Sequence, residues 1–318
     1  MFKKNRIIKV WKLDNIVTFA QQITYWTIFL EASITKPALS VIDENLERYS
    51  PFKYHLLVTI GQDSAACCAM DIKNQNYAAI EQVNFMNNQS IENSFDLFEN
   101  YYKDSTFANI KYKSVTAIVA SEFFTIVPQA LFEASAAEAI LQFNTNINFE
   151  AEIISNQINS IESTVIQAVP VNIKKGFEKL FGEVQVLHHT QPLIMESMTQ
   201  FKNSNESTLL AHIQNGHFEL MVIANHKMIF FNSFKFVTTE DVAYYTLLVC
   251  ETLKLNPEEI TLKLCGEIEK KSAIYALLYK YIRNIEFLNS HRTFKYSGGF
   301  SPLPSHFFFN LINTAHCV

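Results

Sequence analysis

Short hydrophobic runs separated by polar turn residues fill the first half of the chain. The run over residues 54–60 ends at Gly61–Ser64, and the polar residues Lys73–Asn76 separate the next two runs. Turn-forming residues between short apolar runs predict strands that fold back on one another. Apolar residues at helical spacing and a β-branched run then predict a helix and a buried strand. The expected strands are 54–60, 65–71, 77–85 and 114–120, and the expected helix is 90–102.

The same order of elements returns in the second half. A helix is expected to open at Thr238 or Thr239, because Glu240 and Asp241 in its first turn complement the helix dipole, and to end before Pro257. The expected strands here are 208–213, 218–224, 228–236 and 260–266, followed by a helix over 272–281. The order strand–strand–strand–helix–strand–helix therefore appears twice, as a repeat of element order rather than of residue identity.

The segment between the two copies has its own pattern. It predicts strands over 151–157, 164–169 and 183–187, a helix over 171–181 and another from Pro192. A duplicated meander followed by helical crossovers is the layout of the actin-like, ribonuclease-H-type architecture. The predicted fold class is therefore α/β, with two lobes, each a mixed sheet flanked by helices, and a cleft between them.

Composition narrows the function. Of the 318 residues 48% are hydrophobic and 18% are charged, which predicts a large core, and the net charge of −5 gives no reason to expect nucleic acid. The five cysteines are odd in number and four lie in apolar stretches, so we expect reduced thiols and a cytoplasmic location. The apolar segment 16–30 is interrupted by Gln21 and Gln22 and is too short to span a bilayer. We expect a poorly ordered tail or an early start codon there, with a membrane-surface helix as the alternative.

Glycine is scarce, with seven residues in the chain. Loops that wrap phosphates need glycine so that backbone N–H groups can approach the anion closely. The sequence contains no G-x-G-x-x-G, G-x-x-x-x-G-K-[ST] or G-x-S-x-G motif. The common routes to nucleotide binding are therefore disfavoured.

Nine stretches together resemble one bacterial family. They are Val41–Leu46, Tyr54–Leu56, Ala168–Asn172, Gly182, His188–Thr190, Phe231–Phe234, Glu240–Tyr245, Leu255–Pro257 and Tyr279–Asn284. The family is known as domain of unknown function 3822, occurs in Bacteroidota, and is similar to actin-like proteins, nearest to those that assemble pili and secretion platforms. The resemblance covers about residues 41–318 and divides the chain into a tail (1–40), a first lobe with inserted strands (41–205) and a second lobe (206–318).

An actin-like fold implies ATP and magnesium in the cleft between the lobes, held by two glycine-rich hairpins and a later glycine pair at the adenosine. The corresponding positions are degenerate here, since each hairpin has one glycine and Gly266 stands alone. Asp63 or Asp71 could hold a cation, although an aspartate in a turn is usually an Asx-turn residue. The candidate cofactor-binding residues are Gly61, Asp63, Ser64, Asn215, Gly216 and Gly266.

Two hypotheses stay open. One is a scaffold or interaction module without catalysis or cofactor, which binds a protein partner and can self-associate. The other is an ATP-dependent switch or ATPase that uses the candidate residues. For the partner surface, Tyr275, Tyr279, Tyr281 and Arg283 are either a binding patch or a contact between lobes, and Phe307–Phe309 either docks on its own lobe or contacts the partner.

The histidines do not predict a metal site. His188 and His189 follow a short strand, and adjacent strand positions point to opposite faces of a sheet. The sequence also has no H-E-x-x-H or C-x-x-C motif to supply further ligands. We expect Thr190 to cap a helix beside a strand-end histidine, and His306 to lie in the core or at an interface.

Overall fold

The structure is a computed structural model that describes residues 37–86, 88, 90–289, 295–296 and 304–317. The predicted tail lies outside the described residues except for 37–40, and Leu39 and Ser40 already open the first strand. Within the described part of the chain, no helix combines the length and the hydrophobicity needed to cross a bilayer.

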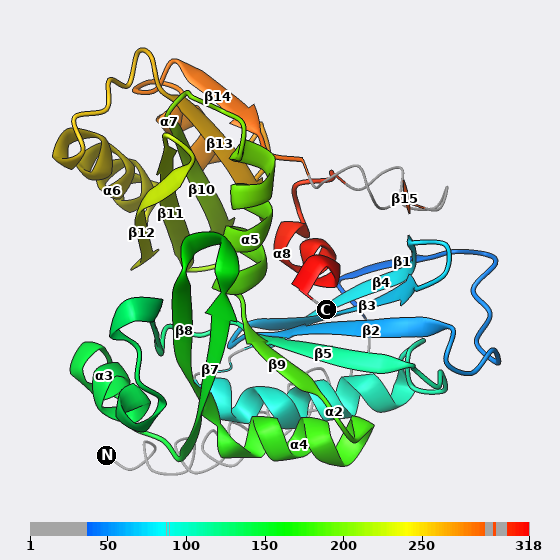
Figure 1. The fold of residues 1–318 in the computed structure, drawn as a ribbon. Coiled ribbons are helices and arrows are strands. Elements are labelled where there is room, and N and C mark those ends of the chain that lie inside the picture. Colours follow the sequence, from blue (N-terminus) through cyan, green and yellow to red (C-terminus); the bar gives the residue numbers. More distant parts are fainter. Residues whose placement is uncertain (1–36, 87, 89, 290–294, 297–303, 318) are drawn as a thin grey trace, which may run out of the picture.

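The first lobe is built on a seven-stranded mixed sheet (Figure 1). Strands β1 to β4 pair antiparallel in the order β1-β4-β3-β2, β5 and β9 follow in parallel beside β2, and β15 pairs with β4. The bounds are β1 Leu39–Ile42, β2 Tyr54–Ile60, β3 Ser64–Asp71, β4 Asn76–Asn84, β5 Ser114–Val119, β9 Gln185–His188 and β15 Lys295–Tyr296. All the strands predicted in this region are confirmed.

Helices α2 (Ser94–Asp104) and α4 (Val171–Phe181) cover one face of this sheet. The rings of Phe95 and Phe177 meet edge to face with 5.2 Å between centroids. Gly176 makes this approach possible, because a Cβ atom there would lie 2.2 Å from the Phe95 ring. Phe98 of α2 and Ile173 of α4 are completely buried against the sheet. The helices predicted over 90–102 and 171–181 are therefore present and are held by the packing of their apolar faces.

The second lobe repeats the first. Its five-stranded sheet has the order β12-β11-β10-β13-β14, antiparallel from β12 to β10 and parallel from β10 to β14. Helix α6 begins with a capping box between Thr238 and Asp241, and it packs with α7 on one face. The bounds are β10 Thr208–Gln214, β11 His217–Ala224, β12 Lys227–Lys235, α6 Thr239–Thr252, β13 Thr261–Gly266, α7 Ala273–Leu278 and β14 Asn284–Phe287. The predicted duplication is therefore confirmed, with β14 as an additional edge strand.

A small three-stranded sheet is inserted between β5 and α4. Its antiparallel order is β6-β8-β7, and helix α3 packs on one face. The bounds are β6 Phe124–Pro128, α3 Ala137–Asn144, β7 Ala151–Ile158 and β8 Ser163–Pro170, with single 3-10 turns at Gln129–Leu131, Ala134–Ala136 and Asn159–Ile161. The two predicted inserted strands are confirmed, whereas β6 and α3 were not predicted.

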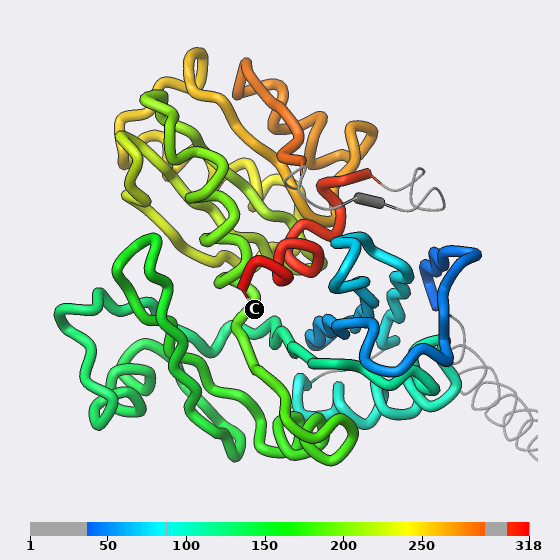
Figure 2. The backbone as a smooth tube through the Cα atoms, turned by 45° about the vertical axis from the view of Figure 1, so that its right-hand side comes forward, coloured from blue at the N-terminus to red at the C-terminus, as the bar shows by residue number. Residues whose placement is uncertain are grey.

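Helices α5 (Thr190–Phe201) and α8 (Phe309–Asn313) lie between the two large sheets and contact each other (Figures 1 and 2). Helix α5 packs on the second sheet through Leu193 and Ile194, while Leu311 and Ile312 of α8 pack on the first. The Tyr77 hydroxyl donates a hydrogen bond of 2.6 Å to the carbonyl of Ile312. The division of the chain between residues 205 and 206 stays a prediction. Helix α5, which precedes this boundary, packs on the second sheet, and helix α8, which follows it, packs on the first.

The Phe307–Phe309 run docks inside the molecule, although not on its own lobe alone. Phe308 packs on the first sheet, and the fully buried Phe309 packs against residues of α5 and the second sheet. Tyr279 and Tyr281 are 61% and 51% exposed, which favours the binding-patch alternative over a contact between lobes. Their role at a partner surface stays a prediction.

Candidate functional site

A pocket of about 920 Å³ lies where the hairpin tips of the two lobes meet the inserted sheet. Its wall includes Gly61, Asp63 and Ser64 from the first hairpin and Asn215 and Gly216 from the second. The structure therefore brings together five of the six candidate residues. Gly266 does not line the pocket, whereas its neighbour Glu267 does. Asp63 precedes strand β3 and Asp71 ends it, so the two carboxylates do not share a cation site. Asp71 instead accepts hydrogen bonds from the backbone N–H groups of Lys73 and Asn74, as the aspartate of an Asx turn does.

The two hairpin tips touch each other. The side-chain amide of Asn215 donates a hydrogen bond of 3.3 Å to Oδ2 of Asp63, across 152 residues of sequence. A second link between the lobes runs from Gln82 Nε2 to Glu267 Oε1 at 3.1 Å. An actin-like ATP site would hold the phosphates between these two tips. In this protein the side chains of Asp63 and Asn215 meet at that position.

Two glycines of the candidate set donate their N–H groups to the chain itself, and Gly266 is also required by packing. The N–H of Gly61 donates to the carbonyl of Ser64 at 2.9 Å, and the N–H of Gly266 donates to the carbonyl of His306 at 2.8 Å. Gly266 has a φ of +86°, and a Cβ atom there would lie 2.1 Å from the Ile213 carbonyl oxygen. At Gly61, by contrast, a Cβ atom would make an ordinary 3.5 Å contact with Ala120. The N–H groups of two candidate glycines, one at a phosphate hairpin and one at the adenosine position, are thus already bonded within the chain.

The charge of the pocket wall is negative. Asp63, Glu122 and Glu267 face it together with one cation, Lys235. The ammonium of Lys235 lies 2.7 Å from Oε2 of Glu122, so its charge is already paired. A triphosphate needs clustered positive charge or several free amide donors. The charge of the wall therefore disfavours Mg·ATP.

The wall also carries apolar side chains among polar ones, and two edge strands border it. Phe124 of β6 and Phe231 of β12 meet edge to face at 6.4 Å, and Ile229 of β12 is 51% exposed. Strands β6 and β12 each stand at the end of their sheet order, so one side of each is not paired within its sheet. The pocket thus offers apolar side chains, carboxylates and two strand edges.

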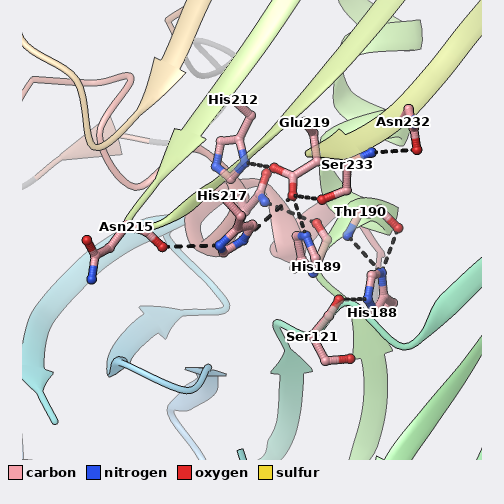
Figure 3. A network of polar contacts seen from close by, with 11 residues as sticks. Ser121, His188, His189, Thr190, His212, Asn215, His217, Glu219, Asn232 and Ser233 are labelled. Carbon is pink, nitrogen blue, oxygen red and sulfur yellow. Dashed lines mark hydrogen bonds and ion pairs between the residues drawn. The ribbon is translucent and has the colours of Figure 1, made fainter. Parts of the chain in front are cut away.

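A buried carboxylate surrounded by histidines forms the adjoining wall (Figure 3). Glu219 on β11 is fully buried, and its Oε1 accepts from His189 Nε2 at 2.9 Å while its Oε2 accepts from His212 Nδ1 at 2.7 Å. The Ser233 hydroxyl also donates to Oε1 at 3.3 Å. Burial raises the pKa of Glu219, but the neighbouring histidines, led by His189, lower it by more than burial raises it. The pKa therefore lies well below its usual value. The carboxylate is therefore ionised.

His217 joins this group from the side of the pocket. Its Nε2 lies 3.7 Å from Oε1 of Glu219, and its Nδ1 donates to the carbonyl of Asn215 at 3.2 Å. Burial lowers the pKa of His217, which favours the neutral ring. The atoms of His189, His217 and Glu219 that could bind a metal all lie within 4.8 Å of one another.

The sequence prediction for the adjacent histidines was wrong in two respects. Helix α5 already begins at Thr190, so His188 and His189 do not alternate as strand residues do, and their rings lie 4.3 Å apart. Thr190 does not cap the helix from outside, since it is the first helical residue. Instead His188 Nδ1 accepts from the Thr190 hydroxyl at 2.8 Å and from its N–H at 3.4 Å. Burial places the pKa of His188 well below its usual value.

The duplicated lobes, the mixed sheets and the helices between them define an actin-like ATPase fold. A protein with this fold and unknown function from Bacteroides thetaiotaomicron VPI-5482 is similar to this chain at 21% identity, with a TM-score of 0.70 over 76% of this chain and 93% of that chain. A chain of the PilM–PilN type IV pilus biogenesis complex is 13% identical, with a TM-score of 0.55 over 83% of this chain and 98% of that chain. At these identities the likeness shows the fold alone.

The family can be stated as well. The model of DUF3822, a family described as proteins of unknown function, matches residues 43–285. This range is more than half of the chain, and the chain belongs to the DUF3822 family. No curated protein matches the sequence.

Proposed function

We propose that this protein is a non-catalytic interaction module that binds a segment of a partner protein in the pocket between its lobes. The observation that carries the proposal is the pocket wall, where three carboxylates face one cation and apolar side chains are exposed, whereas an ATP site would be basic. Asp63 and Asn215 join the tips that would hold phosphates. The proposal therefore assigns the duplicated fold to the positioning of a binding surface.

The wall also suggests the chemistry of the partner. Exposed Ile229 and the aromatic rings of β6 and β12 would contact apolar side chains. Asp63 and Glu267, which form no ion pair among the described residues, would attract a lysine or arginine. An extended segment can add to an edge strand through main-chain hydrogen bonds. The partner segment is therefore expected to be extended, apolar and basic. The PilM–PilN complex supports this proposal, because a chain of the same fold stands there in a protein complex.

A peptide-display selection tests the proposal. Immobilised protein should enrich extended peptides that combine apolar and basic residues. The variant Ile229→Lys, which puts a cation into the pocket wall, should lose these peptides, whereas Tyr49→Lys at a 95% exposed position outside the wall should keep them. Failure to enrich any sequence class, or equal binding by both variants, would contradict the proposal.

The ATP-dependent switch is the second candidate, because five of its six residues do line one pocket. A thermal-shift titration with Mg·ATP separates the two. Ligand at about 100 times its Kd stabilises a protein by about 2.7 kcal/mol, which is a shift of several degrees. The interaction module predicts no saturable shift at millimolar Mg·ATP, and a saturable shift would favour the switch.

Two smaller points belong to the same proposal. A cytoplasmic location is supported by the five free thiols, four of which are buried. Self-association stays a prediction, which light scattering of the purified protein would test.

A further inference from the structure

Three potential metal ligands from two parts of the fold converge beside the pocket. His189 directly precedes α5, and His217 and Glu219 lie on one face of β11 at positions i and i+2 (Figure 3). Two histidines and one glutamate form a known ligand set for zinc, with a fourth position left for water. We propose that His189 Nε2, His217 Nε2 and Glu219 Oε1 bind one divalent transition-metal cation of the zinc type.

The hydrogen bonds of His217 support a cation there. The Asn215 carbonyl can only accept a hydrogen bond, so Nδ1 of His217 carries a hydrogen. Nε2, the other ring nitrogen, faces Oε1 of Glu219 at 3.7 Å, which is too long for a hydrogen bond between these two atoms. A metal cation between them would be bound by both.

The distances suit a metal after small shifts. Ligand atoms about 2.0–2.1 Å from a tetrahedral zinc ion lie about 3.3 Å from one another. In the structure Glu219 Oε1 is 2.9 Å from His189 Nε2 and 3.7 Å from His217 Nε2, which bracket that value. For His189 to bind through Nε2, its ring hydrogen must move to Nδ1. Nδ1 has no hydrogen-bond partner among the described residues, so this tautomer breaks no other bond.

A second layer of contacts holds the carboxylate in place. His212 lies directly opposite Glu219 in the β10–β11 pairing and donates through Nδ1 to Oε2 at 2.7 Å. This bond leaves Oε1 turned toward His189 and His217. His212 is therefore a positioning residue, and loss of such a contact typically weakens metal affinity about 10- to 100-fold.

The cation would connect the two lobes and also face the pocket. The N–H of His189 bonds to the carbonyl of Val119 on the first sheet at 3.3 Å, while Glu219 belongs to the second sheet. His217 lines the pocket and its side chain is 31% exposed, which leaves an approach for water or for a partner's side chain. Bound metal should therefore stabilise the contact between the lobes.

The test uses the full-length protein freed of metal by a chelator and then titrated with Zn²⁺ by calorimetry and with Co²⁺ by visible absorption. We expect one Zn²⁺ per chain, a raised melting temperature and the intense visible bands of tetrahedral Co²⁺. Glu219→Gln and His217→Ala should each weaken Zn²⁺ binding by at least about 100-fold, more than loss of an outer contact does. His226→Asn, which changes an exposed histidine in the next turn of the same sheet, should bind like the wild type.

Two results would overturn the proposal: no stoichiometric Zn²⁺ binding by the wild type, or binding that neither ligand variant weakens relative to His226→Asn. Circular dichroism checks that each variant is folded. If the buried Glu219→Gln does not fold, His217→Ala decides alone, because His217 is partly exposed and stands at the start of its strand.

Discussion

The substitution Gly266→Ala separates a packing role for this glycine from a role in nucleotide binding. A side chain at a φ of +86° costs about 1–2 kcal/mol in a left-handed conformation. The new Cβ atom would also lie 2.1 Å from the Ile213 oxygen, and forced overpacking typically costs about 1–3 kcal/mol more. Because the clashing atom belongs to a backbone that pairs with β13, it cannot turn away. We expect a loss of about 2–5 kcal/mol in the free energy of unfolding.

Two other glycines provide matched controls. Gly216→Ala meets no atom within 4 Å among the described residues but keeps a φ of +74°, so it should cost only about 1–2 kcal/mol. Gly61→Ala has ordinary contacts and no positive φ, so its stability should change by less than about 1 kcal/mol in either direction. Urea unfolding followed by circular dichroism measures all three. Equal losses at Gly61 and Gly266, or a neutral Gly266→Ala, would refute the assignment of Gly266 to packing.

The remaining predictions concern pH and the C-terminal helix. Burial lowers the pKa of His55 from 6.5 to about 4, so its neutral form contributes stability that is complete above pH 6.5 and is lost as the pH falls toward 4. A shift of this size corresponds to about 3 kcal/mol of the free energy of unfolding. In urea unfolding between pH 6.5 and pH 4, His55→Asn should therefore lose about 3 kcal/mol less stability than the wild type. An unchanged pH dependence would contradict this prediction. Phe309→Ala should cost about 3–5 kcal/mol because Phe309 is fully buried between the lobes, against less than about 0.5 kcal/mol for the 71% exposed Leu131→Ala. A loss below about 1 kcal/mol at Phe309 in the same unfolding assay would mean that α8 does not hold the lobes together.

The regular part of the fold could be predicted because local signals and packing agree there. The strand 54–60 is apolar, is bounded by turn residues, and is buried on both faces in the sheet. The missed elements lack such signals. β14 has four residues and is held by parallel pairing with β13 and by packing of Ile285 and Phe287 on the core of the second lobe. β6 ends in Pro128, which is tolerated because β6 is an edge strand. α3 has eight residues and packs on the inserted sheet. For these elements, contacts made after folding decide the structure.

The candidate site was half predictable. Duplication of the lobes explains why the two hairpin tips lie together. No local sequence pattern predicts the hydrogen bond between Asp63 and Asn215. The sequence does contain a signal for part of the histidine–glutamate group. A two-residue turn at Asn215 and Gly216 fixes the hairpin register, and this register places His212 opposite Glu219, with His217 on the same face. The approach of His189 could not be inferred, because it depends on α5 beginning at Thr190.

The central claim is that the N–H groups of Gly61 and Gly266, the glycines at the candidate nucleotide-binding positions, are bonded to the chain itself. Amide hydrogen exchange measured by NMR, with and without millimolar Mg·ATP, tests it at Gly61 and Gly266. The account predicts slow exchange at both N–H groups in the free protein, since they donate to Ser64 and His306, and no change on adding nucleotide. Fast exchange in the free protein that becomes slow when Mg·ATP is added would contradict it.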